Sequence, residues 1–263
     1  MEAHTHSFIR TGQIDSKFGF TLESGEALQG AEEAVRLDAI ALKGFHCHIG
    51  SQIFDEEPFV HAAEVMLGFM DQVRQRTGTV AGELNLGGGF GAKYVESDRP
   101  KSRREMVRLV AGAVSKKAAD LGYPCPYLVL EPGRSVVADA GITLYTVGHV
   151  KKIPGVRTYV SVDGGMPDNP RYILYQSPYT ALIADRAGET PAETVTIAGR
   201  CCESGDLLQE NAPLQACTPG DTLAVLSTGA YNLSMASNYN RLPRPAVVMT
   251  KAGEARVVVR GET

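Results

Sequence analysis

The sequence predicts an α/β part followed by an all-β part: about the second half of a TIM-like (β/α)8 barrel over residues 1–135, then an antiparallel β-sandwich or barrel over residues 136–263. Two observations predict this fold class. Strand-like and helix-like segments alternate in the first part at intervals of about 40 residues, which is typical of parallel strands joined by helical crossovers. After about residue 136, short runs rich in Val, Thr and Tyr follow one another between turn residues.

Three strands and two long helices of the first part have clear local signals. The strands end at Phe45–His48, Leu84–Leu86 and Tyr127–Leu130, each bounded by Gly or Pro. The number of strand–helix units rises from three to four if His4–Ile9 and the helix at Ala27–Leu37 are counted. Between the strands, apolar residues recur at spacings of three and four. The first such set is Phe59, Ala62, Met66, Phe69, Met70 and Val73, and the second is Val107, Val110, Val114, Ala118 and Leu121.

A closed (β/α)8 barrel needs eight such units, and a partial barrel would leave two parallel edges unpaired. We therefore expect this chain to be the C-terminal portion of a longer protein. The strands predicted in the second part are Ile142–Val147, Thr158–Val162, Thr194–Ile197, Thr222–Leu226, and the hairpin of Ala246–Met249 with Ala255–Val259.

Composition excludes several classes of protein. With 43% hydrophobic residues, the 263-residue chain can bury a sizeable core. Its formal charge of −4 offers no basic excess for nucleic acid. No apolar window of about 18 residues predicts a membrane span. The five cysteines are an odd number without a CxxC pair, which argues against a disulfide framework or zinc site and suits a reducing cytoplasm.

Three loops that follow predicted strands carry candidate ligands at the rim where barrel enzymes bind substrates. Leu86-Gly87-Gly88-Gly89-Phe90-Gly91 exposes backbone N–H groups to an anion, although ordinary tight turns have the same composition. Glu131-Pro132-Gly133-Arg134 combines a carboxylate for a protonated ring nitrogen with a guanidinium for phosphate; a surface ion pair is the alternative. His46 and His48 share a strand face and suit a stacked ring near Ser51, core packing or, least favoured, a metal pair.

The second part contributes further polar motifs. Arg171, in Asp168-Asn169-Pro170-Arg171, precedes Tyr175 by four residues, and the two side chains can bind a substrate carboxylate. Cys202-Glu203 places a thiol beside a carboxylate in a polar loop, where simple core packing is less typical. Gly229-Ala230-Tyr231 follows closer to the C-terminus.

Together and in this order, these motifs resemble the fold-type III, alanine-racemase-like enzymes that depend on pyridoxal 5'-phosphate. The narrower resemblance is to the diaminopimelate decarboxylase family, and it runs from Thr11-Gly12 and Ser16–Gly19 to Arg256–Thr263. Six ordered motifs carry the resemblance. It implies decarboxylation of meso-2,6-diaminopimelate to L-lysine and CO2 by a cytoplasmic homodimer with shared active sites.

The resemblance also implies a role for each matched residue. Ser51, Gly89, Arg134 and Tyr231 correspond to residues that hold the cofactor phosphate. The full cofactor-binding set is His48, which stacks on the ring, Ser51, Gly88, Gly89, Glu131, which pairs with the ring nitrogen, Pro132, Gly133, Arg134 and Tyr231. The substrate-binding set is Arg134, Arg171, Tyr175, Glu203 and Tyr231, and no metal is implied.

The chemistry of such an enzyme explains this selection. Loss of CO2 leaves a carbanion that the cofactor ring stabilises, and an acid, which the resemblance assigns to Cys202, then protonates that carbon. The far end of diaminopimelate carries a carboxylate, which Arg171 and Tyr175 can bind, and an ammonium, which Glu203 can bind. Substrates such as ornithine lack that carboxylate, and their decarboxylases usually have Asp in this motif, so Cys202–Asp206 is the most discriminating stretch.

The chain departs from the family pattern in one respect. Family members bind the cofactor covalently through a lysine in a Tyr-x-x-Lys-Ala-Asn-like motif, and none of the lysines here lies in such a motif. Three hypotheses remain. The chain is a portion of a functional decarboxylase, a catalytically inactive remnant that regulates an active partner, or a decarboxylase of a related carboxylate-bearing amino acid.

Overall fold

The structure is a computed structural model that describes residues 17–263, and these residues form two compact units. The first unit comprises residues 17–92 and 99–136, and the second comprises residues 93–98 and 137–263. Residues 93–98 thus belong to the second unit although they lie between segments of the first. The strand expected at His4–Ile9 lies outside the described residues.

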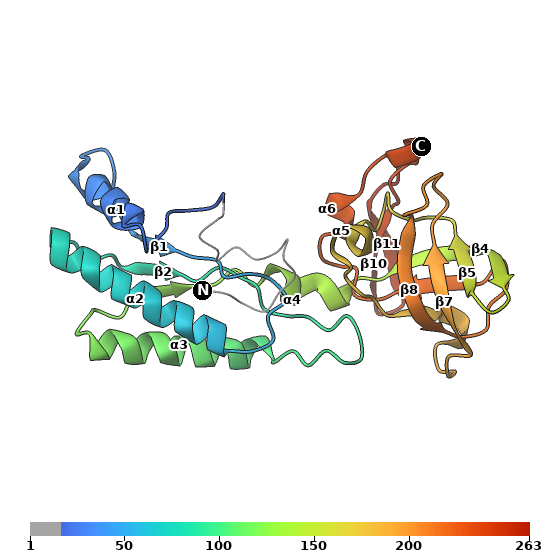
Figure 1. Ribbon diagram of the computed structural model, residues 1–263, viewed down its shortest axis with the longest axis horizontal. Helices are drawn as coiled ribbons and strands as arrows, with labels where there is room; N and C mark the ends of the chain where they lie inside the picture. Colours follow the sequence, from blue (N-terminus) through green and yellow to red (C-terminus); the bar gives the residue numbers. More distant parts are fainter. Residues whose placement is uncertain (1–16) are drawn as a thin grey trace. The chain divides into compact units, whose positions relative to one another are not determined.

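The first unit contains a three-stranded parallel sheet in the order β1-β2-β3. Figure 1 labels two of its strands, β1 and β2, in the blue-to-green part of the chain. The register places Phe45 opposite Leu84, and Leu84 opposite Leu128. The three strands and three helices predicted here are confirmed. They are α1 (Glu26–Arg36), β1 (Gly44–His46), α2 (Glu57–Thr77), β2 (Glu83–Asn85), α3 (Arg103–Asp120) and β3 (Tyr127–Val129), followed by the short α4 (Gly133–Val137).

The two long helices begin and end where their sequences favour it. Pro58 occupies the first turn of α2, where its missing N–H costs no helical hydrogen bond, and Gly78 ends the helix with a left-handed φ of 75°. Ser102 caps α3 by accepting a hydrogen bond from the Glu105 backbone N–H at 3.2 Å.

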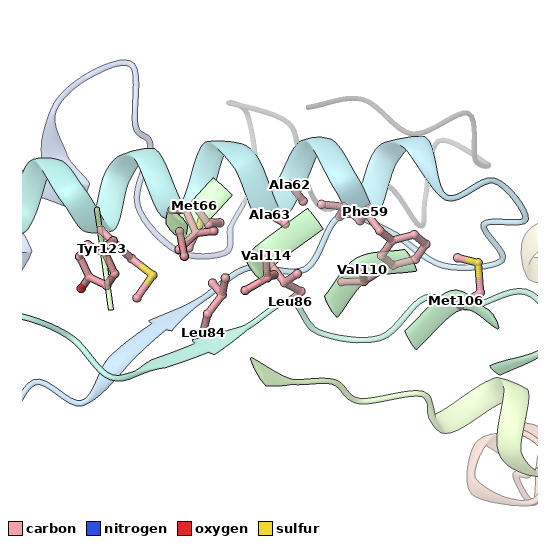
Figure 2. Packing of buried hydrophobic residues seen from close by; sticks show 14 of the residues in the cluster. Phe59, Ala62, Ala63, Met66, Leu84, Leu86, Met106, Val110, Val114 and Tyr123 are labelled. Carbon is pink, nitrogen blue, oxygen red and sulfur yellow. The ribbon is translucent and has the colours of Figure 1, made fainter. Parts of the chain in front are cut away.

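The core of the first unit lies between the sheet and helices α2 and α3. Figure 2 shows Phe59 and Met66 of α2 facing Leu84 and Leu86, with Val110 of α3 beside them. Phe59, Leu84, Leu86 and Val110 are completely buried, and each such side chain contributes about 1.5–3 kcal/mol relative to an exposed one. One residue of the predicted apolar stripe was placed wrongly: Val107 is exposed, and Met106 takes the buried position one residue earlier.

The second unit is built on a six-stranded sheet in the order β6-β9-β4-β5-β7-β8. The expected all-antiparallel arrangement is wrong at one point, because β5 pairs with β7 in parallel and the sheet is therefore mixed. The strands are β4 (Thr143–Ile153), β5 (Arg157–Val162), β6 (Ala181–Ile183), β7 (Glu193–Ala198), β8 (Leu207–Leu214) and β9 (Thr222–Val225).

Two of these strands, β6 and β8, were not predicted. The predicted hairpin is confirmed as a separate two-stranded antiparallel sheet of β10 (Val247–Lys251) and β11 (Glu254–Val259). The connections carry short helices: η2 (Ala138–Ala140), α5 (Arg171–Tyr175), η3 (Ala184–Arg186), α6 (Asn232–Met235) and η4 (Tyr239–Arg241). Within residues 17–263, no helix has the length and apolar character needed to cross a membrane.

Candidate active site

The loops that follow β1, β2 and β3 lie in direct contact. A Cβ atom on Gly88 would overlap the backbone carbonyl of Glu131, and one on Gly89 would overlap the carbonyl of Gly50. Gly89 also has a φ of 103°, which side chains other than glycine rarely allow. The glycine loop therefore brings the Gly50–Ser51 segment and the Glu131–Arg134 segment together, as the parallel arrangement of the strands predicted.

Ser51 and Arg134 form a donor pair beside this glycine loop. The Arg134 Nη2 atom donates to the Ser51 hydroxyl at 2.8 Å, although the two residues lie 83 positions apart. Arg134 is only 7% exposed, and it lies at the start of α4, which begins at Gly133 directly after Pro132. A guanidinium, a hydroxyl and adjacent glycine backbone are the donors that a phosphate group requires.

His48 lies against the same glycine loop. Its Nδ1 atom accepts a hydrogen bond from the Gly88 backbone N–H at 3.3 Å, which requires that nitrogen to be deprotonated. Burial, and secondarily the nearby His46, lower the pKa of His48 below its ordinary value, while Glu131 acts in the opposite direction. The imidazole is therefore held in its neutral form, as a flat surface suited to stacking on a ring.

Glu131 is positioned by a residue to which the sequence analysis assigned no role. The Asn85 Nδ2 atom donates to Glu131 Oε1 at 2.7 Å, and Asn85 Oδ1 accepts from the Gly87 backbone N–H at 2.8 Å. Asn85 is the last residue of β2 and the polar residue between Leu84 and Leu86, which was the available signal. This polar cluster is distinct from the large apolar groove of about 1370 Å³ in the first unit, with which it shares His48.

In the second unit, Arg171 lies between two tyrosine rings. Its guanidinium carbon is 5.1 Å from the centroid of the Tyr175 ring and 4.7 Å from that of the Tyr231 ring. Arg171 is 5% exposed, and its Nη1 atom lies 4.0 Å from the Met235 sulfur. Among residues 17–263 no carboxylate forms an ion pair with it, and its Nε atom has no hydrogen-bond partner.

Tyr231 therefore lies with Arg171 and Tyr175. Its backbone has a φ of 71°, a strained value for a tyrosine. Such strain persists where surrounding contacts hold it, and it is most often found at functional sites. Cation–π contacts to both rings stabilise a buried guanidinium without neutralising it.

The Cys202 loop is held by Asp206. This carboxylate is 2% exposed and accepts hydrogen bonds from the backbone N–H groups of Met166 at 2.6 Å and Cys201 at 2.8 Å. A Cβ atom on Gly199 would overlap the Asp206 side chain, so the packing around it is tight. Asp206 thereby ties the Cys201–Asp206 loop to the segment that precedes Arg171, another link that the sequence analysis missed.

Within that loop, the two adjacent cysteines differ. Burial, followed by the hydrogen bond and charge of Asp206, raises the pKa of Cys201 to about 11. Cys202 is exposed, as is Glu203, whose Oε1 atom accepts from the Gly205 backbone N–H at 3.0 Å. Cys202 is thus the accessible thiol of the pair.

These two sets of residues, one in each unit, carry the features of a protein that binds a phosphorylated ring and a carboxylate. The model "Pyridoxal-dependent decarboxylase, pyridoxal binding domain" matches residues 1–138, and "Pyridoxal-dependent decarboxylase, C-terminal sheet domain" matches residues 94–229. The chain belongs to the pyridoxal-dependent decarboxylase family. The cofactor of this family is pyridoxal 5'-phosphate.

Within the family, the chain is similar to diaminopimelate decarboxylases. Over all 263 residues, the chain is 53% identical to the diaminopimelate decarboxylase of Bacillus subtilis (strain 168), and it spans 60% of that protein's length. Crystal structures of diaminopimelate decarboxylase with L-lysine are also similar. The M. jannaschii structure has a TM-score of 0.88 and 34% identity, over 98% of this chain and 58% of that one. The Helicobacter pylori structure has a TM-score of 0.86 and 29% identity, over 100% of this chain and 62% of that one.

The residues of the first unit fit pyridoxal 5'-phosphate. The Ser51 and Arg134 donors and the Gly89 backbone suit its phosphate, the neutral His48 imidazole suits its ring, and the Glu131 carboxylate suits a protonated ring nitrogen. These residues are the expected cofactor-binding set, and their individual roles remain predictions. Asn85 adds to that set through its contact with Glu131, whereas Met235 and Asp206 contact residues of the second unit.

Proposed function

We propose that this chain serves in the pyridoxal-phosphate-dependent decarboxylation of meso-2,6-diaminopimelate to L-lysine and CO2. The observation that carries the proposal is the buried Arg171 guanidinium, which lies between the Tyr175 and Tyr231 rings and forms no ion pair with a carboxylate of residues 17–263. A buried cation needs a counter-charge. A substrate carboxylate supplies one, and diaminopimelate retains such a carboxylate at the end that does not react.

The residues of the first unit would bind and orient the cofactor. Arg134 and Ser51 would hold its phosphate, His48 would support the ring face, and Glu131 would hold a proton on the ring nitrogen. When bound, the cofactor supplies an electron sink for the charge that CO2 leaves behind. The Arg134 guanidinium would bind the phosphate, and the Glu131 carboxylate would bind the protonated ring nitrogen. The two charged side chains would therefore fix the orientation of the cofactor in the site.

The residues of the second unit would select the substrate and deliver the proton. Arg171 would bind the distal carboxylate, and Glu203 would bind the distal ammonium. Cys202 would donate a proton to the carbon that loses CO2, and its accessible position on the loop supports this role. Substrates without a distal carboxylate would leave Arg171 without its partner and would therefore bind weakly.

The proposal is tested by joining this chain to the N-terminal portion of the B. subtilis relative that it does not cover, and assaying CO2 release. Diaminopimelate, ornithine and arginine are compared as substrates. We expect release from diaminopimelate only. No CO2 release from diaminopimelate would overturn the proposal and favour the alternative of an inactive, regulatory homologue.

Arg171→Met gives the sharper test in the same fusion protein. The product L-lysine keeps the distal carboxylate, whereas cadaverine lacks it. Inhibition by L-lysine should weaken at least about tenfold, the size of one charged hydrogen bond, while inhibition by cadaverine should be unchanged. Arg256→Met, at an exposed position of β11, serves as the matched control. Equal weakening for both inhibitors would count against a carboxylate-binding role.

We further propose a homodimer with shared active sites and a cytoplasmic location. All five cysteines are free, which supports a reducing compartment. The dimer rests on the resemblance of Cys202 to a residue that serves a shared site. Sedimentation of the fusion protein at several concentrations tests it, and a monomer at micromolar concentration would contradict it.

A further inference from the structure

Asn85 occupies the last position of β2, the central strand of the first unit's sheet. Its neighbours in register are His46 of β1 and Val129 of β3. Its backbone carbonyl also accepts a hydrogen bond from the Cys47 N–H at 2.9 Å. The main chain of Asn85 is therefore fixed from both sides, so its side chain projects from a rigid base.

The side-chain amide of Asn85 joins two functional groups of the candidate cofactor site. Its nitrogen donates to Glu131 Oε1 at 2.7 Å, and its oxygen accepts from the Gly87 N–H at the start of the glycine loop at 2.8 Å. The Glu131 N–H in turn donates to the Gly87 carbonyl at 2.8 Å. One side chain thus fixes both the carboxylate and the loop that lies against it.

The amide is the side-chain type that this position needs. An ionised carboxylate only accepts hydrogen bonds, and a backbone N–H only donates them. Asparagine is the short side chain that offers a donor to Glu131 and an acceptor to Gly87 at the same time. Asn85 engages Oε1, one of the two carboxylate oxygens of Glu131.

We propose that Asn85 is a positioning residue that holds Glu131 for the ring nitrogen of pyridoxal 5'-phosphate and anchors the phosphate-binding glycine loop in the same orientation. This inference rests on the proposed function, since it assigns Asn85 a role toward the cofactor of that reaction. It predicts that the effect of Asn85 on cofactor binding passes through Glu131 and depends on the ring nitrogen.

The first test needs no cofactor and uses the 263-residue chain. Amide hydrogen exchange at Gly87 should accelerate about tenfold or more in Asn85→Leu, which removes the acceptor. It should stay at the wild-type rate in Asn85→Asp, which keeps an acceptor. The Gly91 amide, which donates to the Ile53 carbonyl at 2.9 Å, is the internal reference. Unchanged Gly87 exchange in Asn85→Leu would overturn the anchoring role.

The second test compares binding of pyridoxal 5'-phosphate with binding of 1-deazapyridoxal 5'-phosphate, in which CH replaces the ring nitrogen. Asn85→Leu should weaken the first by about tenfold and leave the second nearly unchanged. In a Glu131→Gln background, Asn85→Leu should have little further effect. Gln52→Ala is the matched control: Gln52 clamps the Ala92 backbone through both ends of its amide without contacting Glu131, so any loss of binding should be equal for the two compounds.

The outcomes separate this inference from the proposed function. Equal weakening of both compounds by Asn85→Leu, or independent effects of Asn85→Leu and Glu131→Gln, would show a merely structural role and overturn the inference. If wild-type chain binds neither compound, the cofactor role of the first unit fails with the proposed function, while Gly87 exchange still decides whether Asn85 anchors the loop. The inference is supported if Asn85→Leu weakens binding of pyridoxal 5'-phosphate but not of the 1-deaza compound, and only when Glu131 is intact.

Discussion

Asp206→Ala should release the Cys202 loop from the segment that precedes Arg171. The Asp206 carboxylate is buried and accepts from the Met166 N–H at 2.6 Å and the Cys201 N–H at 2.8 Å. A hydrogen bond to a charged group contributes about 1.5–3 kcal/mol, so two contribute about 3–6 kcal/mol to keeping these amides closed. At about 1.4 kcal/mol for each factor of ten, the opening equilibrium should rise roughly 10²- to 10⁴-fold.

Amide hydrogen exchange measures this opening directly at Met166 and Cys201. Asp206→Asn keeps one acceptor oxygen, so one of the two amides should exchange faster and the other should stay protected. Asp185→Asn, at an exposed position, should change neither amide. Because Asp206 also contributes, after burial, to the raised pKa of Cys201, Asp206→Ala should lower that pKa from about 11 toward 9.0, which the pH dependence of thiol alkylation reports.

One result would show that Asp206 does not hold the loop. If Asp206→Ala left the exchange of both amides within about threefold of wild type, the two hydrogen bonds would contribute less than about 1 kcal/mol. Asp206 would then fill space without holding the loop. Faster exchange throughout the second unit would instead indicate global unfolding, and the Asp206→Asn variant would then decide, because it retains the volume.

Two further predictions concern the first unit. Gly88→Ala should destabilise the first unit by about 1–3 kcal/mol in urea denaturation, because the added Cβ would overlap the Glu131 backbone carbonyl. Gly112→Ala, in open space on α3, should stabilise the unit by roughly 0.5–1 kcal/mol. Equal changes in the free energy of unfolding would contradict the close approach of Gly88 to Glu131. Since the folded-state pKa of His48 is lowered, its contribution to stability is present above pH 6.5 and is lost as pH falls through the lowered value. His46→Asn should raise that pKa in an NMR titration, and a fall would contradict the assigned cause.

Much of the secondary structure could be predicted because its signals are local. The apolar spacing from Phe59 to Val73 and the strand end at Leu84–Leu86 lie within single elements. The strand β6 (Ala181–Ile183) was missed because three residues carry no period. The strand β8 (Leu207–Leu214) was missed because its polar centre and Pro213 are typical of a loop. The parallel pairing of β5 with β7 depends on how the chain returns to the sheet, which no local pattern encodes.

The residues of the candidate site likewise fall into two groups, those that could be selected from the sequence and those that could not. Arg134, Glu131 and Cys202 lie in recognisable motifs, so their residue types and order along the chain were sufficient to select them. Asn85 and Asp206 were not selected, because their importance lies in partners 46 and 40 positions away. A polar residue at the end of an apolar strand was the only indication for Asn85, and Asp206 stood in its motif without an assigned role.

The residues that were missed have a common physical feature. Gln52, Asn85 and Asp206 each bind backbone N–H groups of another loop, and none belongs to the apolar core. A polar side chain that holds a loop in this way contributes a few kcal/mol locally, whereas core residues such as Leu84 hold the whole unit. Substituting the loop clamps should therefore disturb the geometry of the candidate site before the surrounding sheet unfolds.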